Sequence, residues 1–370
     1  MGDGTTPDRE PVGPSGKAPA PALADPDARA RDGASEPLDR FRAICLALGT
    51  GSRWWSDSAW LRFAAQAAAM RPADPGETAR AIAATADQLC QQAHWYETLA
   101  SPLNQVIAAT LVQMGDSAAA FTAEVVAARK LFHAAGFHLE GRHLVTAILA
   151  LRVLSGGRSA TTRVVERMHE LYVRMKAHHW WLTGGEEVPL CALLTAHPGT
   201  AEEIAAAIDV TYHHLHGQGF ASGKHLLTAA NLLALAVGPA PVAAERFLAL
   251  GKIIHQRSLP FWSEEYEGVA LLSLLDHDPE LVLTRLEEVT EALEELLPLQ
   301  FTEVDFNVAV DLVYLDLVRF DAQLRRLGQP EEVERMDAQV RLQRAASLIL
   351  VRVPPIPAIE GGATRWNSGP

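Results

Sequence analysis

Two stretches of the chain decide the fold: HLVTAILALRVLSG at residues 143–156 and HLLTAANLLALAVG at residues 225–238. Apolar residues recur in both with the spacing of an α-helix, and the two align without a gap at an offset of 82 residues. A second pair, TGGEEVPLCALLT around Ala192 and SEEYEGVALLS around Ala270, interleaves with the first at an offset of 78. The chain therefore contains an internal repeat of helical elements.

Together the two series predict a helical hairpin about every 40 residues, with a short apolar first helix and a longer amphipathic second helix. Alternating β-branched runs are nearly absent, so the predicted fold class is all-α. A unit of this size cannot bury its own apolar face, so the hairpins must stack into an open α-solenoid or close into an α/α toroid. The sequence leaves these two architectures open. The last two helical stretches break the pattern and are expected to form a cap.

The domain organisation follows from composition. Residues 1–36 are rich in proline, alanine and glycine and carry almost nothing large to bury, so we predict a disordered tail. Residues 351–370 have the same character and are predicted to form a second disordered tail. Residues 37–350 are then a single domain of stacked hairpins.

Composition also limits the partners. The 370 residues are 48% hydrophobic and 21% charged, enough for a large core, and the formal net charge of −13 disfavours nucleic acid and anionic membranes. The three cysteines, Cys45, Cys90 and Cys191, lie far apart without a C-x-x-C pair, as in proteins of a reducing compartment. No apolar run reaches the roughly 18 residues of a membrane span. We expect a cytoplasmic protein; the oligomeric state is open.

The ends of the longer helices share a basic or titratable residue. Aligning these ends on their aromatic residues places His133, Lys176, His216 and His255 at one equivalent position. Such a column could bind an anionic ligand along one edge of the stack. The alternative is that a helix C-terminus favours lysine and histidine through its dipole.

The starts of the shorter helices alternate in charge. Arg142-His143 and Lys224-His225 open one class of hairpin, whereas Glu186-Glu187 and Glu264-Glu265 open the other. Glutamates in a first turn cap free N–H groups. Basic residues there need another cause: an acidic neighbour in the adjoining hairpin, or an anion bound at the helix N-terminus.

The stretch MKAHHWWLTGGEEVP, residues 175–189, concentrates reactive side chains between two helices. His178 and His179 are candidate proton carriers or hydrogen-bond donors, and Glu186 and Glu187 are their candidate partners. One of Trp180 and Trp181 would stack on the neighbouring hairpin while the other borders a cleft. The alternative is a packed corner without a ligand.

Motifs for metals, cofactors and nucleophiles are missing. Glu166-x-x-His169 has the spacing of a di-iron helix, but no second helix of that type accompanies it. The sequence has no H-E-x-x-H helix, no G-x-S-x-G elbow and no phosphate-binding glycine loop. We therefore expect no metal and no cofactor.

The runs MKAHHWWLTGGEEVPLCALLTAH, GFASGKHLLTAANLLALA and GVALLSLL resemble a bacterial family, the domain of unknown function 4003, over about residues 40–325. The resemblance implies a helical cytoplasmic protein and brings no catalytic residues. The chain departs from that family at Glu186-Glu187-Val188, where an acidic pair followed by an aromatic residue is usual.

Three functional hypotheses follow. In the first, a concave or central cleft binds a peptide or a small anionic ligand. Its predicted binding residues are His133, Lys176, Trp180, Trp181, His216, His225 and His255. In the second, an α/α toroid is an enzyme in which His178 or His179 acts as acid or base with Glu186 or Glu187. In the third, the protein is a scaffold. A closed ring that gathers histidines and glutamates in a pocket favours the enzyme, and an open groove favours binding.

Overall fold

The computed structural model describes residues 36–350 apart from residues 52–57, 93–98, 100, 139–140, 237–239, 260, 297–302 and 326–329. All the described residues belong to one compact unit. The tails predicted at residues 1–36 and 351–370 lie outside the described residues, except that Glu36 begins the first helix.

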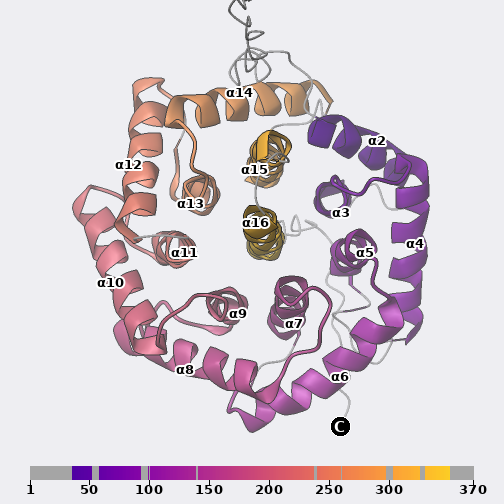
Figure 1. Cartoon of the computed structure of the whole chain (residues 1–370), viewed down its shortest axis with the longest axis horizontal. Coiled ribbons are helices and arrows are strands. Elements are labelled where there is room, and N and C mark those ends of the chain that lie inside the picture. The colour runs from indigo at the N-terminus through magenta and orange to yellow at the C-terminus, as the bar shows by residue number, and fades with distance from the viewer. Residues whose placement is uncertain are drawn as a thin grey trace, which may run out of the picture. The chain divides into compact units, whose positions relative to one another are not determined.

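Throughout the described ranges the regular structure is helical and contains no strand, which confirms the all-α class. The helices form two concentric layers, and Figure 1 looks down the axis of the inner layer. The outer helices are α2 (Glu36–Gly51), α4 (Pro75–Gln92), α6 (Ala118–Ala134), α8 (Thr162–His178), α10 (Ala201–Gly217), α12 (Ala240–Gln256) and α14 (Pro279–Leu296). The inner helices are α3 (Ser58–Ala67), α5 (Leu103–Met114), α7 (Arg142–Leu154), α9 (Val188–Leu194), α11 (Lys224–Leu233), α13 (Tyr266–Leu272) and α15 (Glu303–Arg325).

Burial explains why the sequence separates into these two layers. Every residue of α9 is buried, because the outer layer covers one side and the centre of the ring the other. An outer helix such as α8 buries only one stripe, formed by Val165, Met168, Leu171 and Met175, at roughly helical spacing. The short apolar helices of the sequence are thus the inner layer, and the longer amphipathic ones are the outer layer.

The two ends of the helical series meet. Arg62 on α3 forms an ion pair with Asp305 on α15, although 243 positions separate them. On the outer layer, Arg42 Nη2 donates a hydrogen bond to the Ala292 carbonyl oxygen at 3.1 Å, which joins α2 to α14. These contacts close the described helices into a ring (Figure 1).

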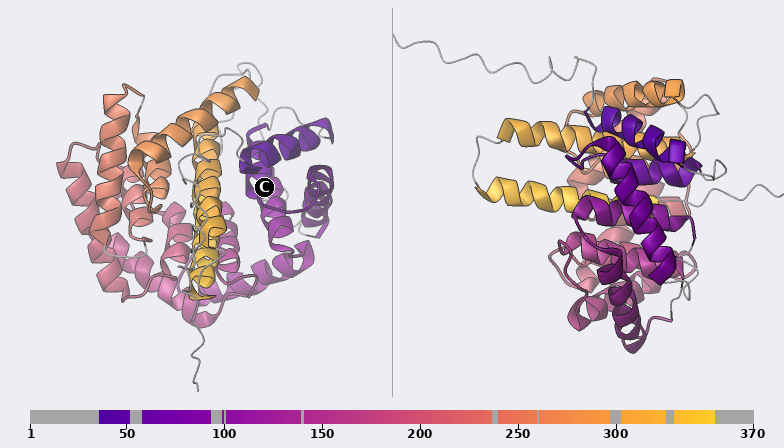
Figure 2. Two further views of the ribbon diagram at one scale, coloured as in Figure 1. Left: turned by 45° about the horizontal axis from the view of Figure 1, so that its top comes forward. Right: turned by 90° about the vertical axis from the view of Figure 1, so that its right-hand side faces the viewer.

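The last helix, α16 (Pro330–Leu350), runs through the centre of the ring, where it packs against α7, α9, α13 and α15. Its polar side chains contact a buried acid: Ser347 Oγ lies 2.6 Å and Gln343 Nε2 3.0 Å from Asp311 Oδ1 on α15. Figure 2 shows that α15 and α16 together extend beyond the ring on one side. The expected cap is therefore corrected: α15 completes the inner layer and α16 fills the ring, because Asp311 pairs with the polar residues of α16.

None of the described helices is by itself long and apolar enough to cross a membrane; α5 and α6 meet the length and composition criteria only as a pair bent by 113°.

Candidate functional site

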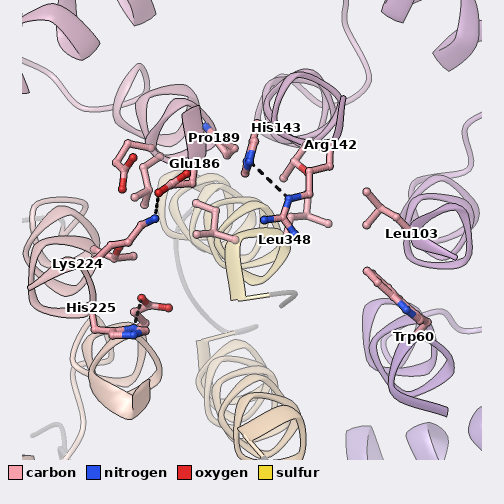
Figure 3. Close-up of a pocket in the computed structure, with 15 residues that line it drawn as sticks. Trp60, Leu103, Arg142, His143, Glu186, Pro189, Lys224, His225 and Leu348 are labelled. Atoms are coloured by element: carbon pink, nitrogen blue, oxygen red, sulfur yellow. Dashed lines mark hydrogen bonds and ion pairs between the residues drawn. The ribbon is translucent and has the colours of Figure 1, made fainter. Parts of the chain in front are cut away.

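A cavity of about 310 Å³ lies where the inner helices α7, α9, α11 and α13 begin. Two short 3₁₀ turns, η2 (Gly185–Glu187) and η3 (Ser263–Glu265), lead into α9 and α13. The lining residues are Trp60, Leu103, Arg142, His143, Thr146, Glu186, Glu187, Pro189, Leu190, Lys224, His225, Thr228, Glu267, Leu348 and Ile349. Figure 3 shows how these side chains converge from separate helices.

The two aligned sequence copies supply equivalent parts of the lining. Arg142-His143-x-x-Thr146 opens α7, and Lys224-His225-x-x-Thr228 opens α11. Because residues four apart share one helix face, each copy directs its basic residue and its threonine to the same side. Both helices follow a glycine with positive φ, 70° at Gly141 and 144° at Gly223, and neither has a side-chain cap.

The basic residues of α11 are paired within the protein. Lys224 forms an ion pair with Glu186 on η2. His225 Nδ1 lies 3.1 Å from Glu267 Oε1 on α13, and the Glu267 side chain is only 5% exposed. For α11, the structure thus supplies the acidic neighbour in the adjoining hairpin, one of the two causes that the sequence left open.

Arg142 on α7 is in a different situation. Its Nε lies 3.5 Å from His143 Nε2, and its guanidinium points into the cavity (Figure 3). Among the described residues, no carboxylate pairs with it. Burial lowers the pKa of His143, and the positive charges of Arg142 and Lys224 lower it further, so that this ring is neutral at pH 7. Its Nε2 can then accept a hydrogen bond from Arg142.

Glu187 is the most buried carboxyl of the lining, 1% exposed. Its Oε2 accepts a hydrogen bond of 2.6 Å from the Gly184 amide, which caps the start of η2. Burial raises the pKa of Glu187 to about 7, and the nearby Glu267 carboxylate adds to the rise. Near neutral pH this group can therefore either donate or accept a proton.

The other side of the cavity is largely apolar. Trp60 on α3 and Leu103 on α5 face the polar groups in Figure 3, and Leu348 and Ile349 on α16 add apolar lining next to those groups. The cavity is thus divided into a charged half and an apolar half. This arrangement suits a small molecule with one polar end and an apolar body.

Three of the residues predicted from the sequence, Glu186, Glu187 and His225, line this cavity. Others lie elsewhere. His133, Lys176, His216 and His255 occupy the last turns of α6, α8, α10 and α12 and are exposed on the outer layer. None of the four is among the residues that line the cavity. Lys176 instead lies over the Tyr172 ring, and His216 Nδ1 lies 3.0 Å from the Phe220 carbonyl oxygen.

The first part of the connection from α8 to α9, residues 178–181, is also absent from the cavity lining. The His179 ring is buried against Tyr212 with centroids 4.7 Å apart, and its Nε2 lies 3.1 Å from Asp209 Oδ1 on α10. His178 Nδ1 is 3.6 Å from the other Asp209 oxygen. Trp180 and Trp181 are 69% and 63% exposed. Among the described residues, both histidines contact Asp209, and no hydrogen bond or ion pair joins them to Glu186 or Glu187.

Several lining residues are not among the binding residues predicted from the sequence. Arg142, His143 and Lys224 had a signal, since the repeat placed basic residues at helix starts where the dipole disfavours them. Little in the sequence pointed to Glu267, because the aligned position of the other copy is Pro189. No sequence signal pointed to Trp60, since it comes from a helix outside the aligned copies. In the part of the chain that the structure describes, no group of three or more His, Cys, Asp or Glu residues is arranged to hold a metal ion.

The family of proteins of unknown function designated DUF4003 matches residues 101–319, a range that includes all the charged residues of the cavity. The chain belongs to this family. The DUF4003 match begins after Trp60 and ends before α16, so part of the apolar wall lies outside it.

One relative is similar to the chain over 179 residues with 30% identity: the uncharacterized protein YeaA of Bacillus subtilis (strain 168). The match covers 46% of this chain and 52% of that protein, so it spans about half the length of the relative. No solved structure matches the chain.

Proposed function

We propose that the protein binds a small organic anion in the cavity at the starts of α7, α9 and α11. The observation that carries this proposal is the guanidinium of Arg142, which points into the cavity without a carboxylate partner among the described residues. Lys224, at the equivalent position of the other sequence copy, has such a partner in Glu186. This difference between the two copies supports a binding place for the ligand's charge beside Arg142.

Physical chemistry favours an anion at this place. A carboxylate or phosphate can accept two parallel hydrogen bonds from one guanidinium. The first turn of α7 lacks a side-chain cap, and the positive end of its dipole adds an attraction on the order of 0.5 kcal/mol. A volume of about 310 Å³ lies at the lower end of small-molecule sites, which favours a compact ligand over a long peptide.

The experiment is a calorimetric and thermal-shift screen with small carboxylates and phosphate monoesters. We expect at least one to raise the melting temperature of the wild-type protein and to lose at least tenfold in affinity for Arg142→Gln. Arg163→Gln, which removes an exposed arginine from the first turn of α8, is the matched control and should bind as the wild type does. Equal binding by both variants would show that the anion binds elsewhere.

A second candidate function is an enzyme that uses this same cavity. Two observations favour it. His225 contacts Glu267 at 3.1 Å, so that the carboxylate can orient the imidazole ring. The same cavity is lined by Glu187, whose pKa is raised to about 7. His225 would take a proton from the ligand and Glu187 would return one, a transfer without net oxidation. These residues replace His178 and His179 as the acid–base groups.

The test of catalysis uses the anion found in the screen. Incubation with the protein in D₂O should exchange a carbon-bound hydrogen of that anion for deuterium, which proton NMR detects. We expect His225→Gln, which removes the proposed base, to abolish the exchange while binding remains detectable by calorimetry. Absence of exchange with the wild-type protein, despite binding, would leave the protein a binding module only.

A further inference from the structure

The charged groups of the cavity divide into those with a partner inside the protein and those without one. Lys224 pairs with Glu186, and His225 contacts Glu267. Arg142 has no carboxylate partner, and Glu187 has no cationic partner, among the residues that the structure describes. One cation and one carboxyl therefore remain for a ligand.

We propose that the ligand is a zwitterion, whose anionic group binds Arg142 and whose ammonium group binds the carboxylate of Glu187. This inference rests on the proposed function, because it takes the anion site at Arg142 as given and adds a second, opposite charge. The two side chains come from neighbouring parts of the inner layer, since α7 packs directly against α9 and Glu187 immediately precedes α9.

The surroundings of Glu187 suit an ammonium group. Its carboxyl accepts hydrogen bonds from the backbone amides of Gly184 and of Glu187 itself, and among the described residues no cationic side chain contacts it. The Glu267 carboxylate lines the same cavity and is close enough to raise the pKa of Glu187, so the field at Glu187 favours a cation. An ammonium ion beside Glu187 would favour its charged form, so binding near neutral pH should release a proton.

The apolar wall limits the rest of the ligand. Trp60, Leu103 and Leu348 offer contacts to an aliphatic or aromatic body. A cavity of about 310 Å³ has room for an amino acid or a dipeptide with apolar side chains. The ligand class is therefore an apolar amino acid or a short peptide bearing both free termini.

Four matched probes test the inference by calorimetry on the full chain: L-leucine, L-leucyl-L-leucine, N-acetyl-L-leucine and L-leucinamide. The first two are zwitterions of different length, the third carries only the anion and the fourth only the cation. We expect one of the zwitterions to bind at least tenfold tighter than both singly charged probes. In two buffers of different ionisation enthalpy, its binding near neutral pH should release protons, because Glu187, whose pKa is raised to about 7, loses its proton on pairing with the ammonium group.

Two variants test which side chain binds which charged group of the ligand. Glu187→Gln should weaken the zwitterion at least tenfold and leave N-acetyl-L-leucine unchanged, whereas Arg142→Gln should weaken both. Glu166→Gln, which changes an exposed glutamate on α8, is the control for charge alone. A melting temperature within a few degrees of the wild type shows that the variants are folded. The wild-type proton release tests the inference even if a variant unfolds.

The outcomes separate this inference from the proposed function. If N-acetyl-L-leucine binds as tightly as the zwitterions and loses affinity with Arg142→Gln, the anion site stands and the zwitterion is wrong. If a zwitterion binds without proton release and without sensitivity to Glu187→Gln, the inference is also wrong. If no probe binds while another anion from the screen does, the ligand is not an amino acid or dipeptide and the inference is overturned.

Discussion

His225 on α11 and Glu267 on α13 meet with Nδ1 and Oε1 3.1 Å apart, and the neighbouring Lys224 pairs with Glu186 on the other side. The start of α11 is thus neutralised from both adjacent hairpins. The start of α7 carries the same motif, but the preceding inner helix α5 presents Leu103 to the cavity instead of a glutamate. This local break in symmetry is the physical basis for placing a ligand beside Arg142.

Placing a carboxylate at the start of α5 should block the anion site beside Arg142. In Leu103→Glu, the new carboxylate should pair with Arg142 and occupy the anion site. We expect anion binding to fall at least tenfold while the free energy of unfolding changes by no more than about 1 kcal/mol, since a half-exposed pair adds little. Calorimetry measures the first and denaturant unfolding the second. Leu103→Gln, of similar size without charge, should bind within threefold of the wild type; equal losses in both variants would indicate a steric cause.

Helix packing at Gly268 predicts a stability effect. A Cβ atom at this position of α13 would lie 2.8 Å from Phe306 Cε1 on α15, closer than real Cβ contacts come, and 3.0 Å from Val310 Cγ2, which is also tight. Gly268→Ala should therefore destabilise the protein by about 1–3 kcal/mol. The control is Gly49→Ala on α2, where no atom lies within 4 Å; it should be neutral or stabilising by up to about 1 kcal/mol. The same change in free energy for both variants would contradict the packing.

The buried Asp311 predicts an unusual pH dependence. Burial raises the pKa of this carboxyl from 3.8 to about 7, so the folded state holds a proton that the unfolded state has lost. The loss of folding free energy caused by this raised pKa is absent below pH 4 and grows as pH rises. It is complete above about pH 7, where it is on the order of 4 kcal/mol. Asp311→Asn should thus stabilise the protein at pH 8 and have little effect at pH 4, measured by denaturant unfolding. A loss of stability at pH 8 would show that burial does not disfavour the Asp311 carboxylate and that its pKa is not raised.

His179 is predicted to act in packing. Its ring is buried against Tyr212, so His179→Ala should lower the free energy of unfolding by about 1–3 kcal/mol. His178→Ala, which removes a partly exposed ring, should cost less than about 1 kcal/mol. Both variants should bind the anion as the wild type does. Lost binding with an unchanged melting temperature would return the functional role to these histidines.

The sequence predicted the elements of the fold better than their assembly. Helical spacing and the aligned copies at His143 and His225 identify the hairpins, because both signals are local. Ring closure depends on pairs such as Arg62 and Asp305, which are distant in the chain and follow from the accumulated rotation of the hairpins. The central position of α16 was hidden because Gln343 and Ser347 have the character of surface residues, while their buried partner Asp311 lies in another helix.

The candidate site was partly predictable for the same reason. Glu186, Glu187 and His225 lie in the aligned copies, and charge at a helix start distinguishes them. The alignment of helix ends at His133, Lys176, His216 and His255 found equivalent positions, but they lie on the outer layer, where the helix dipole is sufficient cause. Trp60 enters the cavity only because the ring brings α3 opposite α9 and α11, which no local pattern records.

The central claim is that a small anion binds beside Arg142 inside the ring, and a crystal structure of the protein soaked with the tightest anion from the screen tests it most directly. We predict electron density for the ligand between Arg142 and the wall formed by Trp60 and Leu103, with two oxygens within hydrogen-bond distance of the guanidinium. Ligand density on the outer layer, with the cavity holding only water at a saturating ligand concentration, would contradict the claim.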